Sequence, residues 1–422
     1  MNAFFALPLN LRLAALAIVG LIIGSLVNLG IYSLAWFARP ISPWQLRHTH
    51  APPRYWSDFL PIIGWFGLAR ESSLHGRGFW IRPVLIEITC AFVFPALCWW
   101  EITGHLAPTV LGVAPPTPTM LNHQFVSHAI LLALMLVATF IDFDEKTIPD
   151  EITIPGTLCG LLLAAIWPDS ALPVDRLIIP PPILPPLKAY QPLLLTSTSD
   201  WPAWLDGTWG LAVGLAIFVA WCMALIPALA TLRRGLWRGT LFYFASIRRG
   251  AAWWKMLLLA VLGCVAISAV WRGDGKSWQA LLSSLVGLCF GGGLVWAVRI
   301  AGRLALHKEA MGFGDVTLMA MIGAFLGWQA CLMIFFGAPF LALLVAVIQA
   351  ISTGRRDIPY GPYLCGVTVL VIVKWPGFWE QFGPLFAFGW LLPIVLAVCV
   401  VLMAAMLTLW RIFENWLFGG AP

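Results

Sequence analysis

Two short acidic motifs, far apart in the chain, hold the residues best suited to chemistry. The first, IDFDEKTIPDEITIP, covers residues 141–155, and the second, GFGD, covers residues 312–315. Asp142 stands at the end of one apolar stretch and Asp315 at the start of another. A charge at membrane depth costs about 2.5–3.5 kcal/mol at a helix centre and less near its ends. Such carboxylates are therefore candidate functional groups.

Asp142 and Asp315 could act together on a peptide bond. Two carboxyl groups held close together cannot easily both ionise, so they share one proton. The ionised member can take a proton from water while the protonated member polarises the scissile carbonyl. This chemistry needs no metal and no covalent intermediate. The motifs predict an aspartyl endopeptidase if the fold brings them together.

The residues around Asp315 fit a functional group, but a purely structural interpretation is also open. Gly312 and Gly314 would let another segment approach closely because glycine has no Cβ, and Asp315 would gain from the N–H groups of a helix start. An aspartate at a helix end is, however, often a cap or a solvated charge. Taken alone, Asp315 favours neither interpretation.

The first motif holds four acidic residues, which are Asp142, Asp144, Glu145 and Asp150. Each, taken singly, is expected to be solvated or to cap a helix, and Asp150 is predicted to be the N-cap of the following helix. Only the pairing with the second motif favours catalysis.

The composition places these motifs in a membrane protein. Of 422 residues, 60% are hydrophobic and 10% are charged, and the mean hydropathy is +0.88. Soluble domains carry about 25% charged residues. The net charge of +6 is small for this length and gives no indication of nucleic-acid binding. The nine cysteines are scattered through apolar segments and none forms a CxxC pair, so neither a disulfide framework nor a zinc ribbon is expected.

About eleven apolar segments approach the roughly 20 residues that a span requires. We therefore predict an all-α, polytopic membrane protein with about 9–11 transmembrane helices. The first segment, within residues 13–37, is too long for the apolar core of a cleaved signal and is expected to be a permanent span. The predicted spans lie near 11–36, 84–100, 124–141, 152–167, 209–230, 254–271, 279–299, 315–331, 332–351, 361–375 and 385–410. The division of residues 315–351 into two spans is open, because Gly337 and Pro339 are the only break in this stretch.

Lysine and arginine predict the orientation in the bilayer. With the N-terminus outside, the alternate loops that include 37–83 and 231–255 hold about three times as many basic residues as the opposite set, which places them in the cytoplasm. Asp142 and Asp315 then both lie at cytoplasmic helix ends. The Pro-rich segment 168–208 is expected outside, as a spacer that contains the extended stretch PPPILPP.

At the two acidic motifs the chain resembles the type IV prepilin peptidases, the bacterial members of the GxGD aspartyl protease group. In the first motif Asp142, Pro149, Asp150, Ile152, Thr153, Ile154 and Pro155 match, and in the second Gly312, Gly314, Asp315, Gly323, Ala324, Gly327 and Trp328 match. A third element, IPYGPY, covers residues 358–363. Further likenesses are GSLVNLGIYSL (24–34), FLPIIGWFGL (59–68), and Arg82, Pro83 and Glu87.

The resemblance implies a division of the chain. Residues 1–123 correspond to N-terminal spans with a cytoplasmic loop, the methyltransferase-like region of the family. Residues 124–167 carry the first catalytic motif, and residues 276–422 carry the GxGD motif with the C-terminal helices. Residues 168–275 have no recognised counterpart and are interpreted as an insertion with two extra helices.

The resemblance also implies a function. Asp142 and Asp315 are the catalytic pair, with Asp144 as the alternative to Asp142. The expected reaction removes a short basic leader from a prepilin or pseudopilin at the cytoplasmic face of the bacterial inner membrane. Many relatives then N-methylate the new terminus with S-adenosylmethionine, which leaves that cofactor open here. The oligomeric state is not indicated by the sequence.

The chain departs from the family pattern in its large cytoplasmic loop. Bifunctional relatives carry two CxxC pairs there, whereas residues 37–83 contain no cysteine, which excludes a four-thiolate zinc site. The histidines of this loop, His48, His50 and His75, are expected to be solvated rather than to bind metal. Glu87 and Asn28 are the polar candidates for methyl transfer, although a role in helix packing is favoured slightly for both.

Two other functions of the chain, and two interpretations of one loop, stay open at this point. The chain could be a catalytically silent assembly or scaffold protein of the same fold in a pilus or type II secretion system. A small-solute transporter is disfavoured because both carboxylates lie at one face rather than near the midplane. The basic, aromatic loop 231–255 is interpreted as positive-inside charge with interfacial anchoring, and alternatively as a site for anionic headgroups or a partner.

Overall fold

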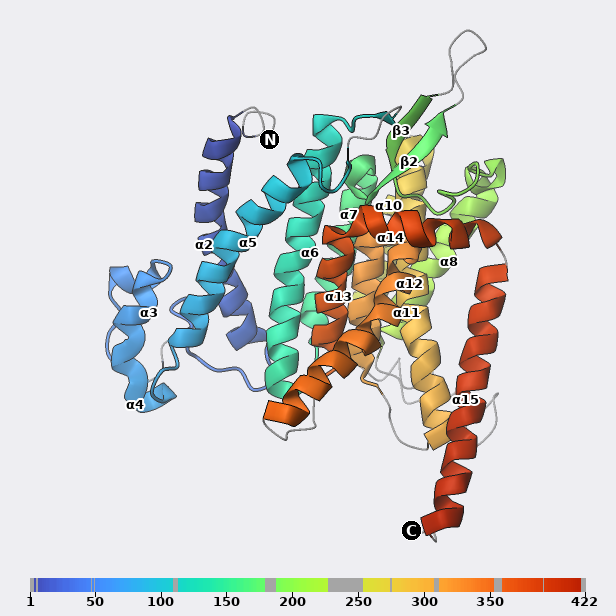
Figure 1. Ribbon diagram of the computed structural model, residues 1–422. Coiled ribbons are helices and arrows are strands. Elements are labelled where there is room, and N and C mark those ends of the chain that lie inside the picture. The colour runs from blue at the N-terminus through green and yellow to red at the C-terminus, as the bar shows by residue number, and fades with distance from the viewer. Residues whose placement is uncertain are drawn as a thin grey trace.

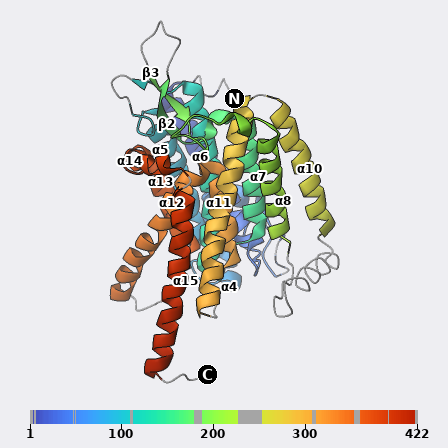
Figure 2. The same ribbon diagram turned by 90° about the vertical axis from the view of Figure 1, so that its right-hand side faces the viewer.

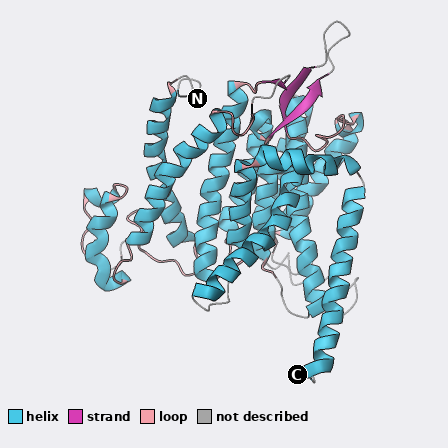
Figure 3. Cartoon of the chain, viewed as in Figure 1, coloured by secondary structure: helices cyan, strands magenta, loops and turns pink. Residues whose placement is uncertain are grey.

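The protein is a bundle of long helices with one small sheet at its end (Figure 3). The computed structural model describes residues 4, 7–46, 48, 50–108, 113–178, 187–226, 253–273, 275–306, 311–352, 359–389 and 391–418. The long helices are α2 (Leu9–Leu34), α5 (Ile81–Ile102), α6 (Pro118–Glu145), α7 (Asp150–Ile166), α8 (Thr208–Ala224), α10 (Trp253–Arg272), α11 (Gly275–Leu306), α12 (Phe313–Ser352), α13 (Gly361–Val373) and α15 (Leu391–Phe418).

The helices have the length and composition of membrane spans. Within the described residues, seven helices are long and apolar enough to cross a bilayer when α12 is counted as one helix, and eight if α13 is counted with α14 (Trp375–Phe382), to which it is joined at a bend of 87°. The all-α prediction is confirmed. Two short helices, α3 (Ile63–Leu68) and α4 (Ser72–His75), lie in the loop between α2 and α5 (Figure 1).

Helix α12 contains the eighth and ninth predicted spans, and its break lies at Gly327 rather than at Gly337 and Pro339, the only break seen in the sequence. The backbone leaves helical geometry at Gly327, which has φ 83° and ψ 171°. The Sγ of Cys331 lies 3.1 Å from where a Cβ on Gly323 would stand. Residues eight apart in a straight helix are about 12 Å apart, so the chain folds back on itself at Gly327. Gly337 instead allows α13 to approach, since a Cβ there would lie 2.7 Å from Val367 Cγ1.

The segment expected to be only a spacer forms strands. Strands β1 (Val113–Ala114), β2 (Pro173–Ile178) and β3 (Leu187–Pro192) make a sheet in the order β1-β3-β2. The β2–β3 pair is antiparallel and runs from Pro173 opposite Pro192 to Ile178 opposite Leu187, while β1 pairs with β3 in parallel. The prolines at 180–186 lie outside the described residues. Helices α8 and α10 are the two helices predicted for the insertion.

The sheet and the start of α2 lie at one end of the bundle, and the junction between α6 and α7 lies at the other (Figure 1). The indole Nε1 of Trp375 donates to the carbonyl of Pro173 at 2.7 Å, which joins the sheet to the bend between α13 and α14. Helix α15 packs beside α11 at the edge of the bundle (Figure 2). Most of its apolar side chains are exposed, as expected for a helix that faces lipid.

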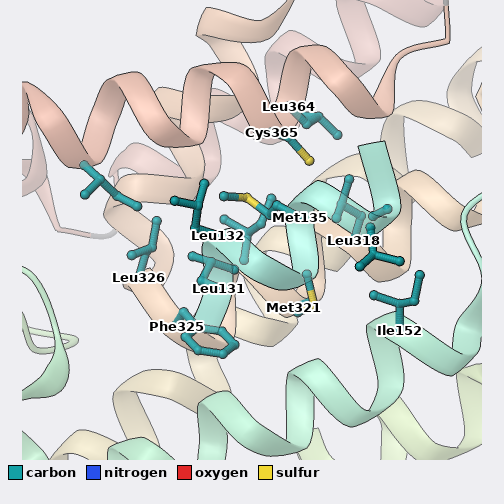
Figure 4. Packing of buried hydrophobic residues seen from close by; sticks show 14 of the residues in the cluster. Leu131, Leu132, Met135, Ile152, Leu318, Met321, Phe325, Leu326, Leu364 and Cys365 are labelled. Atoms are coloured by element: carbon teal, nitrogen blue, oxygen red, sulfur yellow. The ribbon is translucent and has the colours of Figure 1, made fainter. Parts of the chain in front are cut away.

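The main core joins the helices that carry the acidic motifs. Leu131 and Met135 of α6, Met321 of α12 and Leu364 of α13 are fully buried in one cluster (Figure 4). Small residues bring α11 and α12 together, because a Cβ on Gly287 would overlap the carbonyl oxygen of Gly323. Close backbone approach through small residues is a usual way to pack membrane helices. The core thus fixes α6 and α12 relative to each other.

Candidate active site

Asp142 lies in the last turn of α6, at the end of the bundle opposite the sheet. Its side chain is buried, with 4% exposed. The helix stops three residues later, where Lys146 adopts a left-handed conformation with φ 56° and its N–H bonds to the carbonyl of Asp142 at 2.9 Å. Because the chain turns sharply here, the side chain of Ile148 is buried in the main core. The Oδ2 of Asp142 accepts a hydrogen bond of 3.1 Å from the backbone N–H of Gly361.

Asp315 lies in the first turn of α12 and is 8% exposed. The backbone of Gly312 hydrogen-bonds to its carboxylate, and the hydroxyl of Thr317 donates to the carbonyl of Gly314 at 3.1 Å. The guanidinium of Arg299, near the end of α11, donates to the carbonyl of Met311 at 3.1 Å. These bonds hold the glycine-rich turn in place ahead of the helix.

Ile148 is where the two motifs meet. A Cβ on Gly314 would lie 2.9 Å from Ile148 Cβ and 3.1 Å from its backbone nitrogen, and a Cβ on Gly361 would lie 2.9 Å from its Cδ1. The loop after Asp142, the GxGD turn and the start of α13 therefore touch one another. The carboxyl groups of Asp142 and Asp315 are close enough to interact electrostatically.

The other acidic residues of the first motif point elsewhere. Both oxygens of Asp144 bind the Arg82 guanidinium, at 2.9 and 2.8 Å. The Glu145 carboxylate accepts hydrogen bonds from the backbone N–H groups of Trp36 at 2.7 Å and Phe37 at 3.0 Å, just beyond the end of α2. Asp142, rather than Asp144, is thus the residue that lies with Asp315.

The predicted N-cap role of Asp150 is wrong. Pro149 is the N-cap residue of α7, with extended backbone at φ −69° and ψ 138°, and Asp150 is the first helical residue with no capping bond from its side chain. Proline fixes φ and disfavours helix in the residue before it, so the helix starts directly after Pro149. Asp150 is exposed, and its charge is favoured in the first turn of a helix.

Sequence reasoning gave no role to Gly361 or Ile148. Gly361 opens α13, so its N–H lacks a partner within the helix and is free to hold Asp142. The signal was present in the IPYGPY stretch, which was matched to the family without a function. Nothing in the sequence marks Ile148, whose importance comes from its contacts.

A second buried carboxylate, Glu87, organises the packing of α2 against α5. Glu87 is 1% exposed and accepts hydrogen bonds from the Ser25 hydroxyl at 2.6 Å, the Trp65 indole at 2.9 Å and the backbone N–H of Ile62. Asn28 is 3.5 Å from the same carboxylate and donates to the carbonyl of Pro83 at 3.0 Å. Both polar candidates for methyl transfer therefore serve as packing contacts.

The cysteine-free loop is held by hydrogen bonds and an ion pair of two arginines. Arg54 Nη1 donates to the carbonyls of Ser42 at 2.8 Å, Pro43 at 2.8 Å and Gln45 at 3.0 Å. Arg70 binds both oxygens of Asp58. Burial alone would raise the pKa of Asp58, but the hydrogen bonds and charge of Arg70 hold that pKa below its ordinary value.

The histidines of this loop do not gather into one group. The ring of His48 is tilted against that of His50, with centroids 5.6 Å apart, whereas His75 lies 3.4 Å from Glu71. Within the described part of the chain, no group of three or more His, Cys, Asp or Glu side chains could hold a metal ion.

The fold and site define a class: a helical membrane protein with two buried carboxylates brought together at one end of the bundle. A sequence model of the type IV leader peptidase family matches residues 129–347, about half of the chain, and this range includes both aspartates. The chain belongs to the type IV leader peptidase family. Membership and the apolar helices make it a multi-pass membrane protein.

Curated relatives match a shorter part of the chain, and each is named prepilin leader peptidase/N-methyltransferase. The protein of Aeromonas salmonicida is 35% identical over 91 residues, which are 19% of this chain and 29% of the relative. That of Pseudomonas putida is 32% identical over 138 residues (29% and 47%), and that of Escherichia coli K12 is 34% identical over 86 residues (20% and 38%). The chain thus spans less than half the length of each of these relatives. No solved structure matches it.

Proposed function

We propose that this protein is a membrane aspartyl endopeptidase in which Asp142 and Asp315 form the catalytic pair. The observation that carries the proposal is the meeting of two buried carboxylates from motifs 173 positions apart, joined at Ile148. A structural protein gains nothing evident from burying two like charges within range of each other, because such a pair is destabilising unless it shares a proton.

The geometry suggests how the two groups divide the work. Asp142 is held by the Gly361 N–H and Asp315 by the Gly312 backbone. Sharing one proton, the ionised carboxylate would take a proton from water, and the protonated one would polarise the scissile carbonyl. No described cation forms an ion pair with either carboxylate, so the shared proton is the simplest way to balance their charge.

The proposed substrate is a prepilin or pseudopilin with a short basic leader, cleaved at the cytoplasmic face of a bacterial inner membrane. Relatives named prepilin leader peptidase/N-methyltransferase support the substrate. The basic loops support the orientation, with the N-terminus outside and the site inside. Donors of the chain itself already bind Glu87, so methyl transfer is left outside the proposed reaction. No step of the proposed reaction involves S-adenosylmethionine.

Substitution of each aspartate tests the proposal. Purified protein in lipid nanodiscs would be given a synthetic peptide with a basic leader, a Gly–Phe junction and an apolar helix. Asp142→Asn and Asp315→Asn should each lower the cleavage rate by about 10³-fold or more, with unchanged thermal unfolding. Cleavage that survives either substitution would refute the mechanism. If Asp142→Asn and Asp315→Asn both fail to cleave the peptide but support pilus or secretion-system assembly as well as the wild type does, the scaffold role would be favoured instead.

A further inference from the structure

A long apolar groove runs along the bundle between α2 and α6. It has a volume of about 720 Å³, and its walls are almost entirely apolar. Helix α6 contributes one face to the groove, because its lining residues recur in steps of one and three along the chain. The lining residues of α6 are Phe125, Val126, Ala129, Ile130, Ala133, Leu134 and Val137.

The groove has the length of a membrane-spanning segment. On α2 its lining extends from Leu16 to Leu34, which at about 1.5 Å per residue is about 27 Å. The hydrocarbon core of a bilayer is about 30 Å thick. Ala129 and Ala133 lie one turn apart on the α6 wall, an arrangement that lets another helix approach closely. The groove therefore fits one face of an apolar helix.

At one end the groove continues into a polar pocket of about 570 Å³. Leu34 and Glu151 line both cavities. The pocket is also lined by Ile148, the residue that contacts Gly314 and Gly361 beside the two carboxylates. A chain that left the groove at this end would arrive next to the proposed active site.

The charge at this end of the groove indicates whether a phospholipid or a peptide helix would bind there. Asp150 and Glu151 line the pocket, and none of its lining residues is basic. In the described part of the chain neither carboxylate has an ion-pair partner. A phospholipid in the groove would bring its anionic phosphate to these two carboxylates, which is unfavourable. A basic peptide segment joined to an apolar helix would bring the opposite charge.

We propose that the groove between α2 and α6 docks the apolar helix of the substrate and that Asp150 and Glu151 receive its basic leader. The inference rests on the proposed peptidase function and adds where the substrate lies. The helix binds along Leu16–Leu34 of α2 and the alanine face of α6, so the peptide bond after the leader passes Ile148 on its way to Asp142 and Asp315.

Blocking the groove tests the proposal. Ala133→Trp would fill its middle, and Ala266→Trp, on the exposed surface of α10, is the matched control. The probes are two synthetic peptides, one with a basic leader, a Gly–Phe junction and 18 apolar residues, and one that ends a few residues after the junction. Ala133→Trp should cleave the long peptide at least tenfold more slowly than Ala266→Trp does, and both should cleave the short one equally.

Equal cleavage of the long peptide by the two tryptophan variants would overturn the proposal. If the wild type cleaves neither peptide, the peptidase function fails, and docking is then decided by photocrosslinking, which needs no cleavage. A benzoylphenylalanine at position 130 should crosslink to the long peptide, whereas one at position 266 should not. Crosslinks from position 130 to lipid alone would show that lipid occupies the groove and would overturn the proposal.

The acidic end has its own test. Asp150→Asn with Glu151→Gln should slow cleavage of the long peptide by roughly fivefold, which is the loss of about 1 kcal/mol of charge attraction. A peptide whose leader lysines are replaced by glutamine should be cleaved at the same rate by this variant and by the wild type. A loss of equal size on both peptides would show that the two carboxylates support α7 and not the leader.

Discussion

Replacing Gly314 by alanine should disable the second motif, whereas the same change at Gly312 should not. A Cβ on Gly314 would lie 2.9 Å from Ile148 Cβ, 3.1 Å from its nitrogen and 3.2 Å from its oxygen. Two of these atoms are backbone and cannot rotate away. A Cβ on Gly312 would lie 3.6 Å from its nearest neighbour, Asp315 Oδ2, which is ordinary van der Waals contact.

The size of the effect follows from this overlap. Forcing an extra methyl group into a packed site costs about 1–3 kcal/mol, and the motif must shift by several tenths of an ångström to relieve it. Because a displacement of about 1 Å at a reacting group can cost about 10²-fold, kcat/KM for the long synthetic peptide should fall by roughly 10- to 100-fold in Gly314→Ala. It should stay within about threefold of wild type in Gly312→Ala.

The two alanine variants would be compared in nanodiscs by peptide cleavage and by thermal unfolding. Both retain Asp315 and both add one methyl group, so only the local space differs. If Gly314→Ala and Gly312→Ala cleave at the same rate, close approach to Ile148 is not what the motif requires, and our account of how the two carboxylates meet is incorrect.

Three further outcomes follow from the contacts. Asp144→Asn should keep cleavage within about threefold of wild type and lose less than about 1 kcal/mol of stability, because its pair with Arg82 is partly exposed; a loss as large as that of Asp142→Asn would reverse the assignment. Glu87→Ala should lower the free energy of unfolding by about 3 kcal/mol, measured by denaturant titration, because buried donors lose their acceptor; no loss would mean that the network is dispensable. Since Arg70 keeps the pKa of Asp58 below its ordinary value, the pair stabilises the loop above about pH 4 and stops doing so as the pH falls further. The hydrogen-exchange protection factors of amides in residues 53–70, which compare the observed rate with the intrinsic rate at the same pH, should therefore fall between pH 5 and pH 3 in the wild type and depend less on pH in Asp58→Asn.

The helices were predictable because their signal is local. Each segment predicted to be a span lies at least partly in a helix, and α8 and α10 lie in residues 168–275, where two helices were expected. The break in α12 was misplaced because Gly337 and Pro339 look like helix breakers, although membrane helices tolerate both. Gly327 breaks the helix through its positive φ, which composition alone does not reveal.

The site was only partly predictable because it depends on contacts between distant segments. The pairing of Asp142 with Asp315 came from matching two motifs to a family. The hydrogen bond from Gly361 and the contacts of Ile148 required the packed structure. The strands β2 and β3 were missed because the proline-rich stretch between them dominated the pattern. Three expectations stay predictions: that the protein binds no zinc, that it could use S-adenosylmethionine, and that the chain divides into four regions.

The most direct test of the central claim is the double variant Asp142→Asn with Asp315→Asn. Two groups that share one proton and activate one water act as a unit, and losses within a unit do not multiply. Peptide cleavage by the double variant should therefore be about as slow as cleavage by either single variant. Losses that multiply, or a single variant that cleaves like the wild type, would show that the two carboxylates do not work as a pair.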